Sequence, residues 1–411
     1  MRVANTRGRR SIWSRREVLR AALSGASAFA VAPLLAGCGS SSGNGNKTMT
    51  SNIANLGPLG EPDANGVRLP AGFTARILAR TRQEVIPGSG YQWILAPDGG
   101  AVFDAGDGGW IYVSNSEVPA LGPNSGGAAA LRFDRDANLI DAYPILTNTS
   151  INCAGGATPW GTWLSCEEFA LGRVWECDPF GETPGVVRPA LGTFQHEAVC
   201  VDPMLGHLYL TEDVGDGRFY RFTPDRMMDD GFPDITSGAL EVAQIETGEE
   251  GPVIWHVLDD PSGATTPTRL QVAESTAFRG GEGIRYHEGL VYFSTKGDNR
   301  VWVYDTVSET IAIFYDDDDF AEPVLRGVDN VEVSAGGDVL VAEDGDNMQI
   351  VAITPSGVII PILQIEGQAS SEITGPAFGL DGTRLYFSSQ RGTLGHPGGG
   401  ITYEVTGPFF V

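Results

Sequence analysis

The hydrophobic and polar positions of the chain form a unit that recurs six times. In each unit, two short runs of alternating aromatic or aliphatic residues flank a polar turn, and the second run ends in polar or acidic side chains. Such alternation is typical of short antiparallel strands. Equivalent positions in successive units lie 51, 46, 83, 48 and 46 residues apart. These positions are Tyr112, Trp163, Tyr209, Tyr292, Leu340 and Tyr386.

This spacing indicates the architecture. An interval near 46 residues suits one four-stranded blade, so the pattern predicts an all-β, six-bladed β-propeller over residues 66–411. The longest interval holds one blade and an insertion, about residues 225–279, between blades 3 and 4. A two-sheet sandwich is the alternative, but it does not naturally repeat at this length.

The N-terminus has the features of an export signal. Arg15 and Arg16 match a twin-arginine pattern, an apolar run follows at 21–36, and 35–38 (LAGC) resembles a lipoprotein cleavage box. We therefore predict a signal peptide over 1–37, a lipidated Cys38 and a flexible tether over 38–65. The product would be a periplasmic or cell-surface lipoprotein that touches the membrane only through this anchor. The twin-arginine translocase and lipoprotein-processing enzymes would be its partners; an uncleaved anchor is the alternative.

Composition narrows the function further. The 27 Lys and Arg against 52 Asp and Glu give a net charge of −25, which excludes nucleic-acid binding through a basic face. Motifs of serine hydrolases, zinc-helix peptidases and dinucleotide-binding proteins are not found. Four cysteines follow Cys38, and Cys166 with Cys177 is the most plausible disulfide because the two flank a predicted hairpin.

The propeller geometry places acids together. The start of an innermost strand and the end of the next strand lie on the same face, because the two strands are antiparallel. Carboxylates occupy these positions around the ring and suit hard cations, with Ca²⁺ preferred. Single acids at such positions are also common as solvated turn residues. The candidate metal ligands are Glu117, Glu168, Glu197, Glu282, Asp329, Glu343 and Glu372.

Several basic side chains belong to the same segments. Arg279, Lys296 and Arg391 could bind an anionic substrate group or could serve as counterions to neighbouring acids. His196 could be a ligand or a base, but a hydrogen-bonded structural role is equally consistent with a single histidine.

Four segments carry a family resemblance. Residues 152–168 (NCAGGATPWGTWLSCEE) resemble the most distinctive segment of the PhoX-type alkaline phosphatases. Residues 194–198 (FQHEA), 279–283 (RGGEG) and 374–378 (TGPAF) resemble further segments in the family's order. The resemblance covers roughly 69–410. It implies a six-bladed propeller exported by the twin-arginine route, and a phosphomonoesterase with an iron–calcium cluster at the propeller mouth.

The resemblance also implies roles for individual residues. Glu197 and Glu282 would be ligands of the cluster, and Asn115 and Arg279 would contact the phosphate of a small phosphorylated substrate. The family has an iron-bridging cysteine, and whether Cys153 takes its place is left open by the sequence. Ca²⁺ is thus the better supported ion and Fe³⁺ the second.

Two other functions fit the same acids. A calcium-dependent lactonase-type hydrolase would need one metal ion and a base, and a non-catalytic, lipid-anchored binding propeller would need only a structural metal ion. We expect a monomer in each case.

Overall fold

The structure is a computed structural model that describes residues 50–120 and 126–411. Arg15, Arg16, Cys38 and residues 38–49 of the predicted tether lie outside the described residues. No helix within the described ranges is long and apolar enough to cross a membrane. The helices described there are single 3-10 turns: η1 (Ile53–Asn55), η3 (Pro189–Leu191), η4 (Thr268–Leu270), η5 (Lys296–Asp298), η6 (Asp317–Asp319), η7 (Gly392–Leu394) and η8 (Pro397–Gly399).

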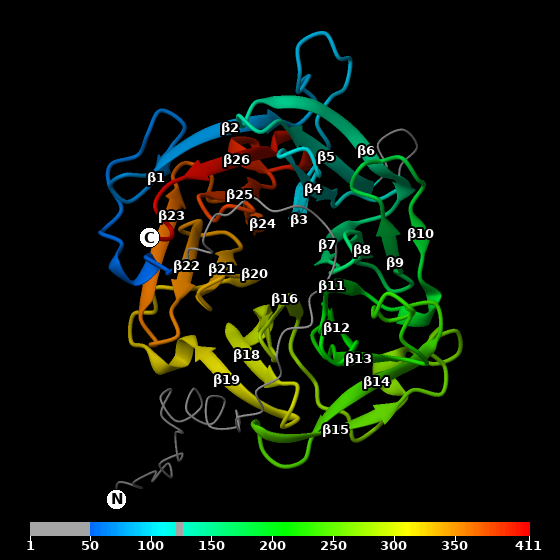
Figure 1. The fold of residues 1–411 in the computed structure, drawn as a ribbon. Helices are drawn as coiled ribbons and strands as arrows, with labels where there is room; N and C mark the ends of the chain where they lie inside the picture. Colours follow the sequence, from blue (N-terminus) through cyan, green and yellow to red (C-terminus); the bar gives the residue numbers. More distant parts are fainter. Residues whose placement is uncertain (1–49, 121–125) are drawn as a thin grey trace, which may run out of the picture.

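The strands form antiparallel sheets that surround a central axis in a propeller-like ring (Figure 1). The first sheet contains β3 (Pro97–Asp104), β4 (Trp110–Ser116), β5 (Gly126–Phe133) and β6 (Leu139–Thr149). The second contains β7 (Asn152–Ala157), β8 (Trp163–Glu167), β9 (Val174–Cys177) and β10 (Val186–Val187).

The third sheet has nine strands. It begins with β11 (His196–Val201), β12 (Leu208–Glu212), β13 (Phe219–Pro224), β14 (Gly238–Ile245) and β15 (Gly251–Val257). It continues with β16 (Gly281–His287), β17 (Leu290–Thr295), β18 (Arg300–Asp305) and β19 (Thr310–Asp316).

Two sheets complete the ring and join the two ends of the described chain. One contains β20 (Val328–Val333), β21 (Val339–Glu343), β22 (Gln349–Ile353), β23 (Ile359–Ile365) and β1 (Val67–Arg68). The other contains β24 (Ile373–Phe378), β25 (Arg384–Ser389), β26 (Ile401–Thr406) and β2 (Thr74–Arg80). Since β2 pairs with β26 and β1 with β23, backbone hydrogen bonds close the ring between early and late segments (Figure 1).

The nine-stranded sheet differs from the predicted arrangement. The segment predicted as an insertion contains β14 and β15, and β14 completes the run β11–β14. Its apolar residues Leu240, Val242 and Ala243 are buried, which explains why it belongs to the sheet. β15 then pairs with both β14 and β19, so hydrogen bonds join the runs β11–β14 and β16–β19. The structure therefore shows an all-β, propeller-like ring of five hydrogen-bonded sheets rather than six separate blades with an insertion.

Core side chains lie between neighbouring sheets. In β21, Leu340 packs with Phe387 of the following sheet, while Val341 on the opposite face packs with Val303 of the preceding one. A strand that is buried on both faces needs apolar residues at consecutive positions, because its side chains alternate between the two faces. This is why second strands such as β12, β17 and β21 have apolar runs and polar C-terminal ends.

Candidate metal centre at the mouth of the ring

The innermost strands share a local irregularity that builds the site. In each of the six, β3, β7, β11, β16, β20 and β24, the pairing with the next strand shifts register near the strand's start. Bulges of this kind re-aim side chains and are frequent beside functional sites. Five of the six irregular stretches contain a polar or acidic residue of the mouth: Asp98, Cys153, Glu197, Glu282 and Asp329.

Small residues after these positions let the inner strands approach closely. A Cβ atom at Gly99 would lie 2.4 Å from the Cα atom of Ala154, and one at Gly283 would lie 2.3 Å from the backbone nitrogen of Val331. Neither contact is sterically possible, so glycine is required for this packing. The close packing brings side chains of successive strands to a common centre.

Four more carboxylates reach the mouth from the other strand ends. Glu117, Glu168 and Asp344 follow β4, β8 and β21, and Glu372 precedes β24 and forms a bridge with Asp344. With the inner-strand residues they form four overlapping groups of three, in which the ligand atoms lie within 4.8 Å of one another. The groups are Asp98–Glu117–Cys153, Cys153–Glu168–Glu197, Glu197–Glu282–Asp329 and Asp329–Asp344–Glu372.

The arc has two parts, which we name by their distinctive residues. The thiol half contains Asp98, Glu117, Cys153, Glu168 and Glu197. The lysine half contains Glu282, Asp329, Asp344 and Glu372, together with Lys296 and Arg391. Cys153 is shared by the two groups of the thiol half, so one sulfur atom lies between two sets of carboxylates.

The lysine half carries its own positive charge. The Lys296 ammonium lies 3.1 Å from Glu282, 3.3 Å from Asp329 and 3.6 Å from Asp344. Arg391 pairs with Glu372 at 2.9 Å. Burial lowers the pKa of Lys296, but Asp329, Glu282 and Asp344 outweigh burial and raise it, so the ammonium stays charged.

The acids of the thiol half interact with Lys296 and Arg391 only from a distance. Among residues 50–120 and 126–411, its carboxylates form no ion pair with lysine or arginine; Gln390 donates to Asp98 and Glu117, and Gln195 to Glu168. Burial, followed by repulsion from Glu117, raises the pKa of Glu168 to about 8. Burial also raises the pKa of Glu197 well above its usual range, with Glu282 and Glu168 adding to the effect.

The thiol half fits metal ions. One carboxylate oxygen of Glu197 is fully buried without a hydrogen-bond partner, which is costly unless a cation or proton neutralises it. The Cys153 thiol donates to the other oxygen at 3.3 Å. Burial raises the pKa of this thiol, and a coordinated metal ion would displace its proton. Carboxylates suit hard ions and a thiolate suits softer transition metals, so the donor set accommodates both kinds.

The structure brings six of the seven predicted ligands together, and Glu343 is the exception. Its buried carboxylate accepts hydrogen bonds from the backbone N–H groups of Arg326 at 2.7 Å and Gln349 at 3.0 Å. Asp344, the next residue, reaches the mouth instead. Consecutive residues near a strand end point to opposite sides, so only one acid of this pair can reach the mouth, and it is Asp344 rather than the predicted Glu343.

In two other hairpins, the glutamate that ends the second strand also accepts backbone hydrogen bonds instead of pointing into the mouth. Glu167 and Glu212 each accept from the backbone N–H six residues later, as Glu343 does, and these donors are Arg173 and Arg218. Where two acids are adjacent at this turn, the first carboxylate therefore stabilises the loop by accepting backbone hydrogen bonds. The acidic pairs Glu167–Glu168 and Glu343–Asp344 recur in the sequence, so this pattern could have been recognised there. The mouth positions of Asp98 and Cys153 are visible only in the tertiary structure.

Asn115 does not have the predicted position. Its amide donates to the carbonyl oxygens of Cys153 and Ala154, and its oxygen accepts from the Trp163 indole and the Ser165 hydroxyl at 2.9 and 2.8 Å. These four hydrogen bonds use the full capacity of the side chain. Asn115 thus fixes the backbone of β7 beneath the thiol, and it has no donor left for a phosphate.

Arg279 and His196 differ in their surroundings. Arg279 is exposed directly before β16, and its guanidinium forms no hydrogen bond or ion pair with any described residue. His196 is fully buried, lies 3.6 Å from the Phe194 ring and bonds the Gly192 carbonyl. Burial lowers the pKa of His196 to about 3, so this histidine is neutral and structural.

The predicted disulfide is also wrong. Cys166 and Cys177 are free and buried. In the β8–β9 pairing, Cys166 lies opposite Val174 while Cys177 lies opposite Trp163, so the two cysteines are at different ends of the hairpin.

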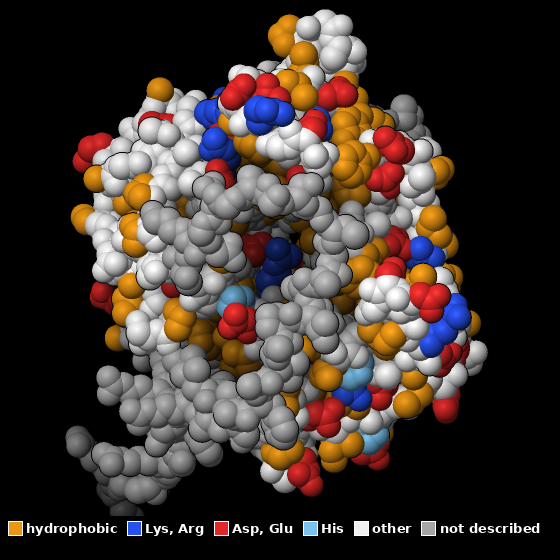
Figure 2. All heavy atoms as spheres, viewed as in Figure 1, with side chains coloured by type: hydrophobic (Ala, Val, Ile, Leu, Met, Phe, Trp, Pro, Cys, Tyr) orange, Lys and Arg blue, Asp and Glu red, His pale blue; other side chains and the backbone are white. Residues whose placement is uncertain are grey.

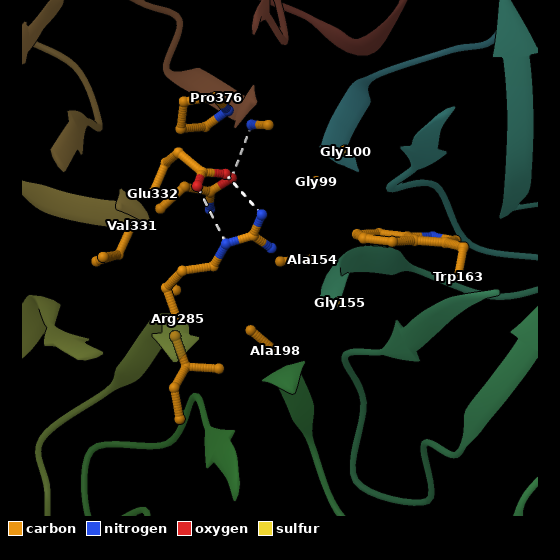
Figure 3. Close-up of a pocket in the computed structure, with 14 residues that line it drawn as sticks. Gly99, Gly100, Ala154, Gly155, Trp163, Ala198, Arg285, Val331, Glu332 and Pro376 are labelled. Atoms are coloured by element: carbon orange, nitrogen blue, oxygen red, sulfur yellow. Dashed lines mark hydrogen bonds and ion pairs between the residues drawn. The ribbon is translucent and has the colours of Figure 1, made fainter. Parts of the chain in front are cut away.

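The centre of the ring is hollowed, with basic and acidic side chains visible inside (Figure 2). Arg285 and Glu332 each follow a mouth residue by three positions, and their side chains point toward one another across the channel (Figure 3). The guanidinium lies 3.0 Å from the carboxylate, beside Ala154 and Gly155. This pair lies in the channel three residues beyond Glu282 and Asp329 along β16 and β20.

The fold and the site together define a class: a propeller-like protein with an acidic, thiol-containing mouth suited to metal ions. A family model described as "Alkaline phosphatase PhoX" matches residues 107–174 and 170–393, more than half of the chain. The chain belongs to the PhoX alkaline phosphatase family.

Comparison with a solved PhoX structure agrees on the fold. PhoX of Pseudomonas fluorescens in complex with vanadate, a transition state analogue, superimposes with a TM-score of 0.69 at 17% identity, covering 86% of this chain and 98% of that chain. A gluconolactonase of Xanthomonas campestris superimposes with a TM-score of 0.47 at 12% identity, covering 86% and 98% of the two chains. A search of curated proteins found no match.

Proposed function

We propose that this protein is an extracytoplasmic, metal-dependent phosphomonoesterase whose active centre is the thiol half of the mouth. The observation that carries the proposal is the shared position of Cys153 between two carboxylate groups in a chain of the PhoX family. A single thiol placed between two acidic groups is suited to bridge two metal ions. The structure of the related PhoX of Pseudomonas fluorescens is a complex with vanadate, a transition state analogue, and this supports phosphate chemistry for the present chain.

The residues have distinct parts in this function. Asp98, Glu117, Cys153, Glu168 and Glu197 would hold the ions, with iron favoured at the thiolate and calcium at the carboxylates alone. Bound ions would supply the positive charge that clamps phosphate oxygens and polarises phosphorus.

Arg279 has the properties required to bind the substrate phosphate. Its guanidinium is exposed, and Glu282 follows three residues later at the start of β16. A guanidinium can form two parallel hydrogen bonds to a phosphate and stabilise the charge that develops during transfer. The ion pair of Arg285 and Glu332 beneath the mouth favours substrate entry and product release through the same face.

We also infer six blades, with β15 joining the two middle ones. The six register-shifted inner strands and the sixfold sequence unit support this count.

The proposed location outside the cytoplasm rests on the predicted export signal with Arg15, Arg16 and Cys38. Membrane fractionation of Cys38→Ala tests the anchor, and retained attachment with normal processing would contradict it.

The decisive experiment measures metal and activity together. Natively exported wild type should contain metal and hydrolyse p-nitrophenyl phosphate, whereas Glu197→Gln should lose both. Glu61→Gln removes an exposed carboxylate outside the mouth and serves as the matched control. Arg279→Ala should keep the metal and lose turnover. Fully metallated wild type without activity on any phosphomonoester would overturn the proposal.

A further inference from the structure

Lys296 is held at the mouth by its backbone. It follows β17 directly and begins η5, and its N–H donates to the Gly280 carbonyl at 2.8 Å. The next N–H, of Gly297, donates to the Arg279 carbonyl at 2.8 Å, and a Cβ atom at Gly297 would lie 2.9 Å from the Cβ atom of Arg279. The lysine backbone is thus fixed against the segment that enters β16.

The ammonium lies among carboxylates from three different strand ends. Glu282 starts β16, Asp329 lies in β20, and Asp344 follows β21. The single positive charge of this ammonium therefore forms ion pairs with three carboxylates. Two of its partners belong to the group Glu197–Glu282–Asp329, and two belong to Asp329–Asp344–Glu372. One side-chain cation therefore forms ion pairs with two members of each group, and all three of its partners belong to the lysine half.

The presence of lysine instead of arginine at position 296 also suits a cation that is surrounded by several carboxylates. Of the 27 basic residues in the chain only two are lysines, Lys47 and Lys296, and arginine provides all the others. A guanidinium is a planar fork suited to one carboxylate, whereas an ammonium is a compact point charge that several acceptors can surround. In this respect the lysine resembles a metal ion.

We propose that Lys296 is a built-in cation that takes the place of a divalent metal ion in the lysine half. The inference rests on the metal centre of the proposed function and adds that the bound ions of the wild type gather in the thiol half. Removing the ammonium should leave a vacant set of carboxylates with the oxygen ligands that Ca²⁺ prefers.

The test compares metal content and thermal stability of purified, full-length variants. After saturation with Ca²⁺ and desalting, Lys296→Met should contain one more divalent ion per chain than wild type. Its melting temperature should fall below that of wild type in chelator and recover with Ca²⁺. Lys296→Arg, which keeps a positive charge, should show the wild-type ion count.

Arg76→Met is the matched control for net charge, because Arg76 pairs with the buried Glu404 at 2.8 Å on β26, outside the mouth groups. It should leave the ion count unchanged. An unchanged count in Lys296→Met would overturn the inference, as would a Lys296→Met protein that does not fold even with Ca²⁺. If wild type binds no ion and Lys296→Met binds one, the proposed function fails while this inference stands.

Discussion

The two halves of the mouth contain equal numbers of carboxylates but balance them differently. Four acids of the lysine half surround Lys296 and Arg391, whereas the four acids of the thiol half surround Cys153. Three of these four accept hydrogen bonds from glutamine side chains, and Glu197 accepts one from the Cys153 thiol. Acid density alone therefore does not identify the metal centre. The distribution of internal cations does, because buried carboxylates without counterions favour a bound ion over solvation.

Metal removal should have the largest effect. Ions that bind only the folded state stabilise it by about 2.7 kcal/mol when free metal is 100 times its dissociation constant. Chelation should therefore lower the melting temperature measured by calorimetry by several degrees. Adding back metal should reverse the change. An unchanged melting temperature after verified loss of all ions would contradict the comparison between the halves.

Cys153→Ser should separate the two kinds of ion. A hydroxyl is a poor substitute for a thiolate toward transition metals, whereas carboxylates bind Ca²⁺ without sulfur. We expect iron content by elemental analysis to fall at least about tenfold, with calcium content retained. Cys200→Ser, a buried cysteine outside the mouth groups, is the control. Equal metal loss in both variants would show that the sulfur of Cys153 has no special role.

Glu343→Gln should affect stability and leave the metal in place. The two backbone N–H groups donate to different carboxylate oxygens, and glutamine replaces one of these oxygens with an NH2 donor. We therefore expect a loss of about 1–3 kcal/mol in denaturant unfolding. Glu168→Gln should do the reverse and reduce metal content with a smaller structural cost. If Glu343→Gln lost metal like Glu168→Gln, the division between loop-holding and mouth acids would be wrong.

The stability of the metal-free protein should also depend on pH. Burial, then Glu117 and Asp213, raise the pKa of Glu168 from its ordinary 4.5 to about 8. Between these values the folded state binds more protons than the unfolded state, so stability falls as pH rises from about 5 to 8. Chemical denaturation across this range should show the decline, and Glu168→Gln should flatten it. A rise in stability over the same range would contradict the assignment.

The sequence alone determined the repeating unit, the all-β class and most of the acids. Strand alternation and turn residues are local properties, and a recurring interval exposes them without knowledge of neighbours. The four resembling segments also pointed to the family, and six of the seven predicted ligands meet at one mouth.

Tertiary structure decided the rest. Which acid of a pair faces the mouth depends on the bulge and register of each hairpin, so Asp344 rather than Glu343 is at the site. Contacts between residues far apart in sequence decide three further features. Asn115 donates hydrogen bonds to β7, Cys153 lies between two carboxylate groups, and Lys296 forms ion pairs with several acids. Such contacts exist only when the sheets close into a ring, because closure brings the starts of all inner strands to one centre.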